Sequence, residues 1–447
     1  MSDYTEHARL SPSGSKKWFA CPGSITLEAP IPNKSSTYAD DGTAMHEIAA
    51  RCLTQHYRAV KWVGEQIPVH AAGEEPRFVE FDDEMADLVQ GYVDTVRAMA
   101  IGYTLLVEQR VDFSEFVGVP GQFGTLDAGI HFHDQGEIFA GDLKTGRTPV
   151  HVEGNSQLLL YLLGLLRKLL DDDLGAAETD PFEYARRIGI KTCRIGIYQP
   201  KLAAGMREWT CTLEELEAFA DVARRKASQV EGAAMMFTKM PRDQWDRTYL
   251  NPNPNEEECA FCRAMATCPA AAAKVEREVG GAFSEVVEDA GAAVERVAQS
   301  TDDLLGEQMA AAGFIEDWCK AVRAETERRL LAGTPVPGFG LELGRKPPRK
   351  WDDVEGVAAA MKEMRMSIED RFNLKLKSPT QIEALCDPKK NEKPILGPRQ
   401  WKKLQERIRQ GDPSPSVKPI ALIKNPYKPA PPSADAFSAV DDASDLA

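Results

Sequence analysis

Stretches of helical periodicity alternate with short strand-like stretches along the first 270 residues. Apolar residues at helical spacing predict helices over residues 39–57, 83–100, 155–169 and 212–236, with Asn155 or Ser156 as the cap of the third. Residues 103–112 and 192–199 are rich in β-branched and aromatic side chains, which predicts strands. Interleaved helices and strands are typical of an α/β domain.

The segment 124–146 predicts a β-hairpin. Apolar residues alternate with Asp127, Gly129 and His131, and the chain turns near Gln135-Gly136 before a second strand. With Gln135 and Gly136 as a two-residue turn, Asp127 pairs with Lys144 and Gly129 pairs with Asp142. Directly paired residues share one face, so Asp127, Asp142 and Lys144 are expected to project together. The opposite, buried face is expected to hold Leu126, Ala128, Ile130, Phe132, Phe139 and Leu143.

Composition divides the chain into parts. Residues 1–270 are expected to form the main domain and residues 271–333 a helical region. Pro, Gly and Lys become frequent over residues 334–430, and residues 431–447 have the composition of a disordered tail. Residues 345–430 contain 20 Lys and Arg against 11 Asp and Glu. This basic region is either a solvated, flexible segment or an auxiliary DNA-contacting region.

The net charge of −15 excludes a protein that coats nucleic acid without preference, because such binding requires many basic residues. Any contact with DNA must therefore be local. The chain has no long apolar run and begins without a secretory signal, so we expect a cytoplasmic protein with no membrane association. It also has no phosphate-binding loop of the G-x-x-x-x-G-K-[ST] type, so we expect no use of ATP.

The predicted hairpin brings together residues that suit phosphodiester hydrolysis. Asp127 and Asp142 offer hard oxygen ligands for Mg²⁺ or Mn²⁺, and Lys144 can stabilise negative charge on a phosphate. Taken alone, Asp142 and Lys144 are more typical of a surface ion pair on an amphipathic hairpin. The surrounding motifs decide between these interpretations.

The order of these motifs resembles the PD-(D/E)XK nuclease superfamily in its RecB-like, AddB-like exonuclease branch. The motifs are Gly124-Thr125-Leu126-Asp127, then Gly141-Asp142-Leu143-Lys144-Thr145-Gly146, then Gln157 and Tyr161 one helical turn apart. The resemblance implies a restriction-endonuclease-like mixed central sheet flanked by helices, with Asp127 and Asp142 as metal ligands and Lys144 as a catalytic residue. It also implies that Gln157 and Tyr161 support the site or contact substrate, that His46 is a further metal ligand, and that Glu108 is an additional acidic residue.

Three of the nine cysteines lie close together. Cys259 and Cys262 are spaced C-x₂-C, and Cys268 follows six residues later. Cys21 is the best candidate for a fourth ligand, and a Cys₄ site would clamp the amino terminus to the end of the main domain. Four thiolates accept either zinc or an iron-sulfur cluster, and the spacing alone favours zinc. Unliganded thiols are the third possibility.

One early and three late cysteines on either side of the nuclease motifs resemble the RecB-like nucleases that carry a 4Fe-4S cluster. The resemblance therefore implies a stand-alone nuclease of the phage or prophage type, acting in DNA recombination, repair or replication. Its expected partners are linear or single-stranded DNA ends and a single-strand annealing protein. Two alternatives stay open: a DNA-binding accessory protein that keeps the fold without cleaving, and a zinc protein of another role.

Overall fold

The computed structural model describes residues 8–32, 37–69, 77–203, 205–281, 302–343, 350–351, 353–373, 375–376, 378–383, 386–387, 393–409, 415–419 and 426. The chain divides into two compact units, Met1–Cys319 and Lys320–Ala447. The predicted tail over residues 431–447 lies outside the described residues, as do residues 282–301 of the predicted helical region.

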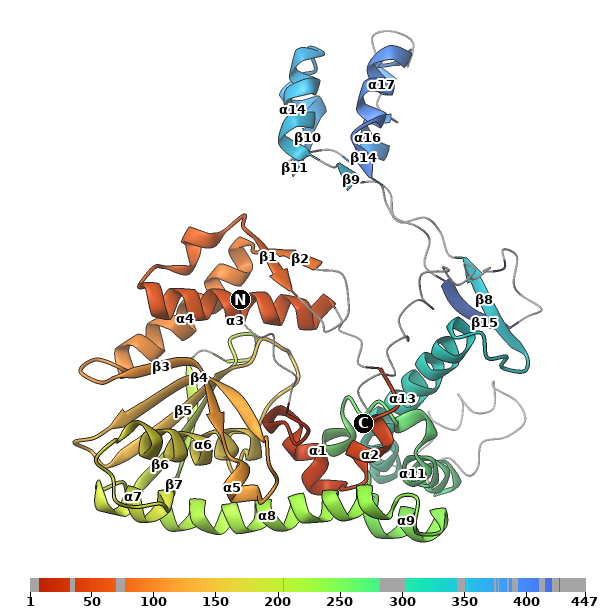
Figure 1. The fold of residues 1–447 in the computed structure, drawn as a ribbon. Coiled ribbons are helices and arrows are strands. Elements are labelled where there is room, and N and C mark those ends of the chain that lie inside the picture. The colour runs from red at the N-terminus through yellow and green to blue at the C-terminus, as the bar shows by residue number, and fades with distance from the viewer. Residues whose placement is uncertain are drawn as a thin grey trace, which may run out of the picture. The chain divides into compact units, whose positions relative to one another are not determined.

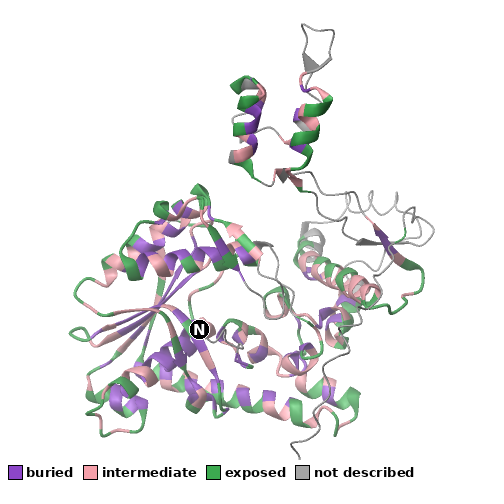
Figure 2. Cartoon of the chain, turned by 45° about the horizontal axis from the view of Figure 1, so that its top comes forward, coloured by how far each residue is buried: buried purple, intermediate pink, exposed green. Residues whose placement is uncertain are grey.

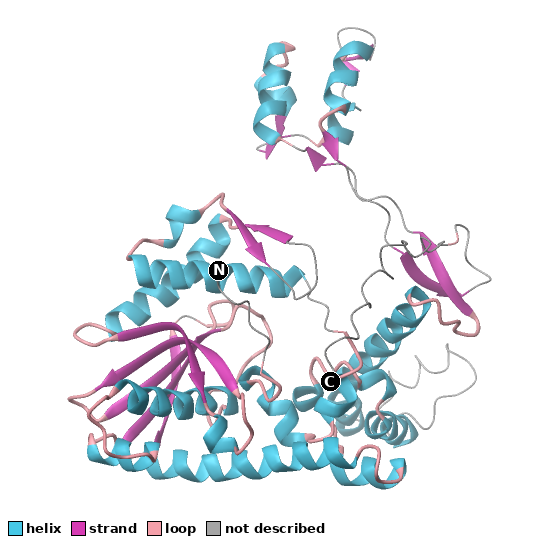
Figure 3. Ribbon diagram, in the orientation of Figure 1, coloured by secondary structure: helices cyan, strands magenta, loops and turns pink. Residues whose placement is uncertain are grey.

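A five-stranded mixed sheet forms the centre of the first unit (Figures 1 and 3). Its strands follow the order β3 (Leu105–Asp112), β4 (Phe123–Phe132), β5 (Glu137–Leu143), β6 (Thr192–Tyr198) and β7 (Met206–Thr212). Strands β5 and β6 are parallel, and the other neighbours are antiparallel. The predicted class, α/β with a mixed central sheet flanked by helices, is confirmed.

Helices cover both faces of this sheet (Figure 1). On one face, α3 (Thr37–Gln55) and α4 (Asp83–Met99) share an apolar core with Ala128 and Leu143. On the other face, α6 (Ser156–Asp172) and α8 (Leu213–Met236) pack over a second core. Strands β5 and β6 are consequently buried along most of their length (Figure 2).

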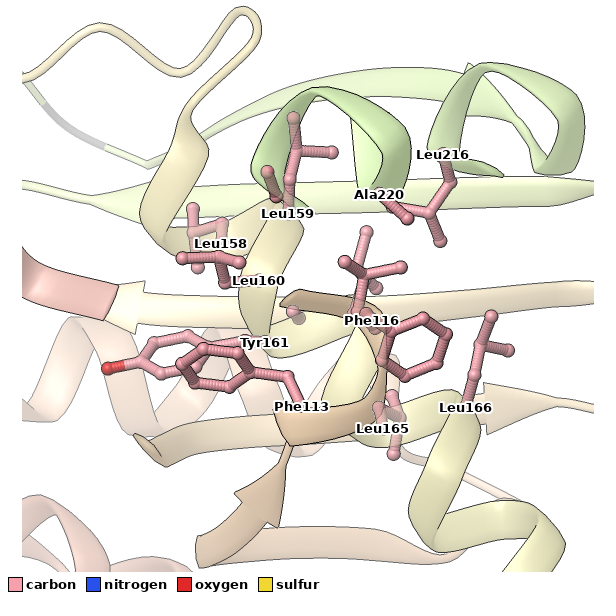
Figure 4. Packing of buried hydrophobic residues seen from close by; sticks show 14 of the residues in the cluster. Phe113, Phe116, Leu158, Leu159, Leu160, Tyr161, Leu165, Leu166, Leu216 and Ala220 are labelled. Atoms are coloured by element: carbon pink, nitrogen blue, oxygen red, sulfur yellow. The ribbon is translucent and has the colours of Figure 1, made fainter. Parts of the chain in front are cut away.

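Helix α6 is the main apolar element of the second core. Its cap is Asn155, one of the two predicted caps, whose side chain accepts a hydrogen bond from the Leu158 backbone N–H at 3.2 Å. The leucines of α6 face Phe113 and Phe116 on one side and the α8 residues Leu216 and Ala220 on the other (Figure 4). Each fully buried leucine contributes about 2 kcal/mol, so this helix fixes the position of the polar residues on its first turn.

The β4–β5 hairpin differs from its predicted register by two residues. Ala128 pairs with Gly141 and Phe132 with Glu137, so residues 133–136 form a four-residue connection in place of the expected two-residue turn. The predicted pairs Asp127–Lys144 and Gly129–Asp142 are therefore wrong. Because side chains alternate with a period of two, a two-residue shift still leaves Asp142 and Lys144 on one face of β5.

The alternation along β4 reverses at Asp127. Leu126 packs into the core under α6, whereas Ala128, two residues later, packs into the core under α3 and α4. Opposite this point on β3, Glu108 has a φ of 45°, a left-handed backbone conformation that is uncommon outside glycine. Leu126 therefore does not share a face with Ala128 as predicted, and Asp127 lies where the strand changes faces.

Several short elements complete the first unit. A two-stranded antiparallel sheet, β1 (Gln66–Val69) and β2 (Arg77–Glu80), follows α3. The others are η1 (Pro12–Gly14), α1 (Ser15–Ala20), α2 (Ser24–Glu28), η2 (Ala59–Trp62), α5 (Ser114–Val117), α7 (Pro181–Arg187), α9 (Arg242–Tyr249), α10 (Glu256–Cys259), η3 (Met265–Thr267) and α11 (Pro269–Gly281). Helix α13 (Asp302–Leu331) extends past the boundary of the unit at Cys319.

The second unit has a small apolar core of its own. Val357, Met361 and Leu404 are fully buried there, beside Trp351 and Trp401. Its helices are α14 (Val354–Glu363), α15 (Ile368–Arg371), α16 (Pro379–Glu383) and α17 (Pro398–Gln405). Its antiparallel strand pairs are β8 (Phe339–Leu343) with β15 (Pro415–Pro419), β9 (Lys350–Trp351) with β14 (Ile408–Arg409), β10 (Phe372–Asn373) with β11 (Lys375–Leu376), and β12 (Cys386–Asp387) with β13 (Lys393–Pro394). Part of the basic region is thus folded.

Across the portions of the chain described, no helix is both long enough and apolar enough to cross a membrane.

Candidate functional site

Asp142, Lys144 and Gln157 form one hydrogen-bonded group. The Lys144 ammonium lies 3.0 Å from Asp142 Oδ1 and 2.9 Å from its Oδ2, and it donates to Gln157 Oε1 at 3.0 Å. Gln157 Nε2 in turn donates to Asp142 Oδ1 at 3.0 Å. Asp142 lies on β5, Lys144 follows directly after that strand, and Gln157 lies in the first turn of α6. The predicted carboxylate, lysine and glutamine are thus in direct contact.

Asp127, His46 and Glu108 form a second group. Asp127 Oδ2 lies 3.2 Å from His46 Nδ1 and accepts a hydrogen bond from the Leu143 backbone N–H at 2.8 Å. One donor atom from each of His46, Glu108 and Asp127 lies within 4.8 Å of the other two. Asp127 is one residue beyond the last β4–β5 pair, Ala128–Gly141, which places it beside Asp142 at the end of the hairpin.

The electrostatics of the two groups are linked. Burial raises the pKa of Asp142, and the nearby charge of Asp127 adds to that shift while Lys144 opposes it. For Asp127, the cost of burial is outweighed by the charge and hydrogen bond of His46, so its pKa is lowered. Loss of solvent and the Asp127 charge raise the pKa of Glu108 to about 7. Three carboxyl groups therefore share one small region, where negative charge accumulates without enough compensating positive charge.

This arrangement fits a hard divalent cation. Carboxylate oxygens and an imidazole nitrogen are suitable donors for Mg²⁺ or Mn²⁺. The side chain of Asp142 is only 3% exposed. Its Oδ2 is buried and, although it lies beside Lys144 Nζ, no side chain or backbone group in the described structure forms a hydrogen bond with it. The Lys144 ammonium supplies one positive charge beside this buried oxygen, so the case for a divalent cation rests on the carboxyl groups of Asp127 and Glu108 gathered next to it.

Helix α3 reaches the site because residue 42 is glycine. A Cβ atom at Gly42 would lie 3.1 Å from Thr145 Oγ1, in the loop directly after Lys144. The small residue lets α3 approach the end of β5 closely and brings His46, one turn later, to Asp127. The Gly42-Thr43-x-x-His46 motif thus has a packing explanation as well as a chemical one.

Tyr161 contacts the group of Asp142, Lys144 and Gln157 through Gln157. Its hydroxyl accepts a hydrogen bond from Gln157 Nε2 at 3.3 Å, and no direct hydrogen bond joins it to a carboxylate among the described residues. Burial and the charge of Asp142 raise the pKa of Tyr161, so it remains a neutral phenol. Its ring lies against Gly124, where a Cβ atom would come within 2.5 Å of it. Tyr161 is therefore placed to orient Gln157.

The four predicted cysteines line one pocket. Cys21 follows α1, Cys259 ends α10, Cys262 lies in the turn after it, and Cys268 precedes α11. Cys21 Sγ accepts a hydrogen bond from the Asn251 backbone N–H at 3.4 Å, which joins the amino-terminal segment to the far end of the first unit. The structure thus places Cys21 and the three late cysteines around one pocket, and their joint binding of a metal stays a prediction.

A buried ion pair holds this pocket together. The carboxylate of Glu28 is only 4% exposed and lies 2.6 Å from Lys17 Nζ. It also accepts a hydrogen bond from the backbone N–H of Arg263, within the cysteine loop, at 2.8 Å. Trp245, fully buried, packs against Cys21 and Cys268. These contacts were not predicted, because a Lys and a Glu eleven residues apart give no periodic signal.

The surroundings of the pocket keep its four thiols neutral. Burial raises the pKa of Cys259 to about 11 and those of Cys21 and Cys262 to about 12, and it also raises the pKa of Cys268. Thiols in such surroundings keep their protons unless a metal replaces them. The donor set fits zinc or an iron-sulfur cluster.

Gln199 is a further polar residue near the site that sequence reasoning missed. It is 1% exposed and hydrogen-bonds the loop after Lys144 on both sides. Its Nε2 donates to the carbonyl oxygens of Gly146 and Thr148 at 3.0 and 2.7 Å, and its Oε1 accepts from the Val150 N–H at 3.2 Å. A glutamine at the end of a predicted strand has no distinguishing sequence pattern, since the segment it binds is 50 residues away.

The fold and the site define a mixed α/β protein. At the end of its central hairpin, the buried Asp142 contacts Lys144 and Gln157 beside a cluster of potential metal ligands. Over residues 7–421 the chain matches the family described as "Protein of unknown function (DUF2800)". Because this match spans most of the 447 residues, the chain belongs to the DUF2800 family.

Proposed function

We propose that this protein is a metal-dependent DNA nuclease of the PD-(D/E)XK type, RecB-like branch, and that it hydrolyses phosphodiester bonds. One observation carries the proposal: Asp142, Lys144 and Gln157 are mutually hydrogen-bonded at the end of a hairpin, next to Asp127 with its His46 and Glu108 neighbours. In an ordinary surface ion pair both partners are exposed, whereas the Asp142 side chain is 3% exposed and the half-buried Gln157 bridges both partners. The restriction-endonuclease-like topology is part of the same proposal.

Asp127, Asp142, Glu108 and His46 would hold Mg²⁺ or Mn²⁺. The ion, when bound, supplies an acidified water and neutralises charge on the phosphate. Lys144 stays protonated: burial lowers its pKa, but the charge and hydrogen bond of Asp142 together with the charge of Asp127 raise its pKa by more. Its ammonium is therefore available to donate to a phosphate oxygen as negative charge develops. Gln157 holds Lys144 and Asp142 in fixed orientations, and Tyr161 orients Gln157.

The cysteine pocket is proposed to hold a 4Fe-4S cluster, with zinc as the alternative. Among the described residues, no three of the pocket's sulfur atoms lie within 4.8 Å of one another. A tetrahedral zinc site with bonds near 2.3 Å needs sulfur atoms about 4 Å apart. The order of one early and three late cysteines, which resembles that of the 4Fe-4S RecB-like nucleases, supports the cluster. Its role would be structural, because hydrolysis transfers no electrons.

Nuclease activity is tested by incubating the protein, purified without oxygen, with end-labelled linear DNA and with circular DNA. We expect cleavage with Mg²⁺ or Mn²⁺ and none with a chelator. Cleavage of linear DNA alone identifies an exonuclease, and cleavage of circles identifies an endonuclease. Metal-independent binding of DNA without cleavage would support the accessory-protein alternative in place of the nuclease, and neither binding nor cleavage would reject both.

Replacing Gln157 by leucine tests the bridge between Asp142 and Lys144. We expect cleavage at saturating DNA to fall by about 10- to 100-fold, the usual effect of losing a partner behind a metal ligand. The substitution Tyr161→Phe removes only the outer hydroxyl, so it should cost less. The measurement is single-turnover cleavage by both variants, and a larger loss in Tyr161→Phe than in Gln157→Leu would contradict the assigned order of contacts.

A further inference from the structure

An arginine and a phenylalanine form a stacked pair on the hairpin side of the candidate site. Arg110 on β3 lies with its guanidinium carbon 3.5 Å from the centre of the Phe123 ring on β4. Arg110 pairs across the strands with Thr125, two residues before Asp127, and is itself two residues beyond Glu108. The stacked pair therefore lies two residues along β3 from Glu108, just beyond the point at which β3 and β4 change faces.

The Arg110 side chain is exposed, and among the described residues no carboxylate forms an ion pair with it. Neighbouring acids are otherwise engaged: Asp112 Oδ1 accepts a hydrogen bond from the Ser114 N–H at 2.8 Å, and Glu108 belongs to the group around Asp127. A guanidinium that stacks through its flat face keeps its in-plane N–H groups for an anion. In a chain of net charge −15, this is a locally cationic position beside an acidic centre.

The support beneath the stacked pair is rigid. Gln122, next to Phe123, is 4% exposed, and its side-chain oxygen accepts a hydrogen bond from the Leu10 backbone N–H at 2.8 Å. Its side-chain amide donates to the Pro120 carbonyl oxygen at 2.8 Å, and its backbone N–H donates to Ser114 Oγ at 2.8 Å. The start of β4 is therefore fixed, and binding at Arg110 and Phe123 requires little further ordering.

We propose that Arg110 and Phe123 form a nucleotide subsite, in which Arg110 binds the phosphate next to the scissile one and Phe123 supports a base. This inference rests on the proposed nuclease function and extends it to a substrate with a continuous phosphate backbone. Two residues along a strand span about 7 Å, which is comparable with the separation of neighbouring phosphates in an extended single strand. Every base can stack on an aromatic ring, so the subsite is expected to bind the sugar–phosphate backbone of DNA without preference for a base sequence.

The test compares Arg110→Ala with Arg225→Ala, which removes the same charge from another exposed position, on α8. Binding of a fluorescein-labelled single-stranded oligonucleotide is measured by anisotropy with Ca²⁺ in place of Mg²⁺, over a series of salt concentrations. We expect Arg110→Ala to bind about tenfold more weakly. The slope of log K against log salt should fall by about 0.7, the value for one lost phosphate contact on a single strand. Arg225→Ala should change neither quantity.

Hydrolysis of bis(p-nitrophenyl) phosphate, which has one phosphodiester and no neighbouring phosphate, separates the subsite from the reaction centre. Arg110→Ala should cleave this small ester at the wild-type rate while its cleavage of DNA falls. If Arg110→Ala matches Arg225→Ala on DNA, or loses both reactions equally, the subsite is wrong although the nuclease assignment stands. If the wild-type protein neither binds nor cleaves DNA, the proposed function fails and the subsite fails with it.

Discussion

Asp142→Asn should abolish metal-dependent DNA cleavage while leaving the protein folded. The substitution keeps the shape of the side chain and removes the charge that a divalent cation requires. Loss of even an outer partner of a metal ligand costs 10- to 100-fold, so we expect loss of a ligand to reduce cleavage by more than about 100-fold. The measurement is single-turnover cleavage of end-labelled linear DNA with Mn²⁺.

The stability of the Asp142→Asn variant without metal should change little. Burial already raises the pKa of Asp142, which means that its charged form is disfavoured in the folded protein. A neutral asparagine removes this cost, so the thermal midpoint without metal should be close to that of the wild type. Mn²⁺ should raise the thermal midpoint of the wild type, because a ligand that binds the folded state stabilises that state. The effect on the variant should be much smaller, because the variant lacks the charged ligand.

Asp171→Asn is a matched control. Asp171 lies in the last turn of α6, far along the helix from Gln157, where its side chain is 53% exposed and forms an ion pair with Arg167. Its replacement should change neither cleavage nor the response to Mn²⁺. Undiminished cleavage by Asp142→Asn would reject the assigned centre, whereas equal losses in both variants would indicate a general defect in folding.

The face on which the site residues lie could be predicted from sequence, although the hairpin register could not. A period of two preserves the face for any even shift, so counting two turn residues in place of four left Asp142 and Lys144 correctly grouped. The reversal at Asp127 could not be predicted, because strict alternation was assumed for a strand that in fact contributes to two cores. Glu108, with its left-handed backbone, marks the same position on β3.

Elements with a strong local signal were predicted well, and elements without one were missed. Helix α6 has a polar cap followed by a long apolar run, and its observed start is the predicted one. Strand β7 was missed because its pattern of exposed and partly buried positions resembles a loop. The subsite residue Arg110 was missed for a related reason: an exposed arginine on an edge strand has no distinguishing sequence feature until its contact with Phe123 is known.

Cys262→Ser should remove the bound metal and destabilise the first unit. A serine hydroxyl is a poor ligand for the soft metals that four thiolates select, so one substitution breaks the site. If the pocket holds a 4Fe-4S cluster, the brown absorbance near about 400 nm should be lost. If it holds zinc, the wild-type protein should be colourless and metal analysis should show the zinc falling in the variant.

The destabilisation should begin at the amino terminus. The cysteine pocket joins Cys21, after α1, to the loop that carries Cys259, Cys262 and Cys268, so its loss frees residues 8–32 from the far end of the first unit. Metal binding to such a site contributes directly to folding. We expect the thermal midpoint to fall by about 5 °C or more, and limited proteolysis to cut first between α2 and α3.

Cys319→Ser is the control for this experiment, because Cys319 has the same intermediate exposure as Cys262 and lies outside the pocket. It should retain the absorbance, the metal content and the midpoint of the wild type. Cleavage by Cys262→Ser well below its midpoint should persist, since the hydrolytic groups are contributed by β4, β5, α3 and α6 and not by the pocket. A variant that keeps its metal and its midpoint would show that the four thiols are not a ligand set.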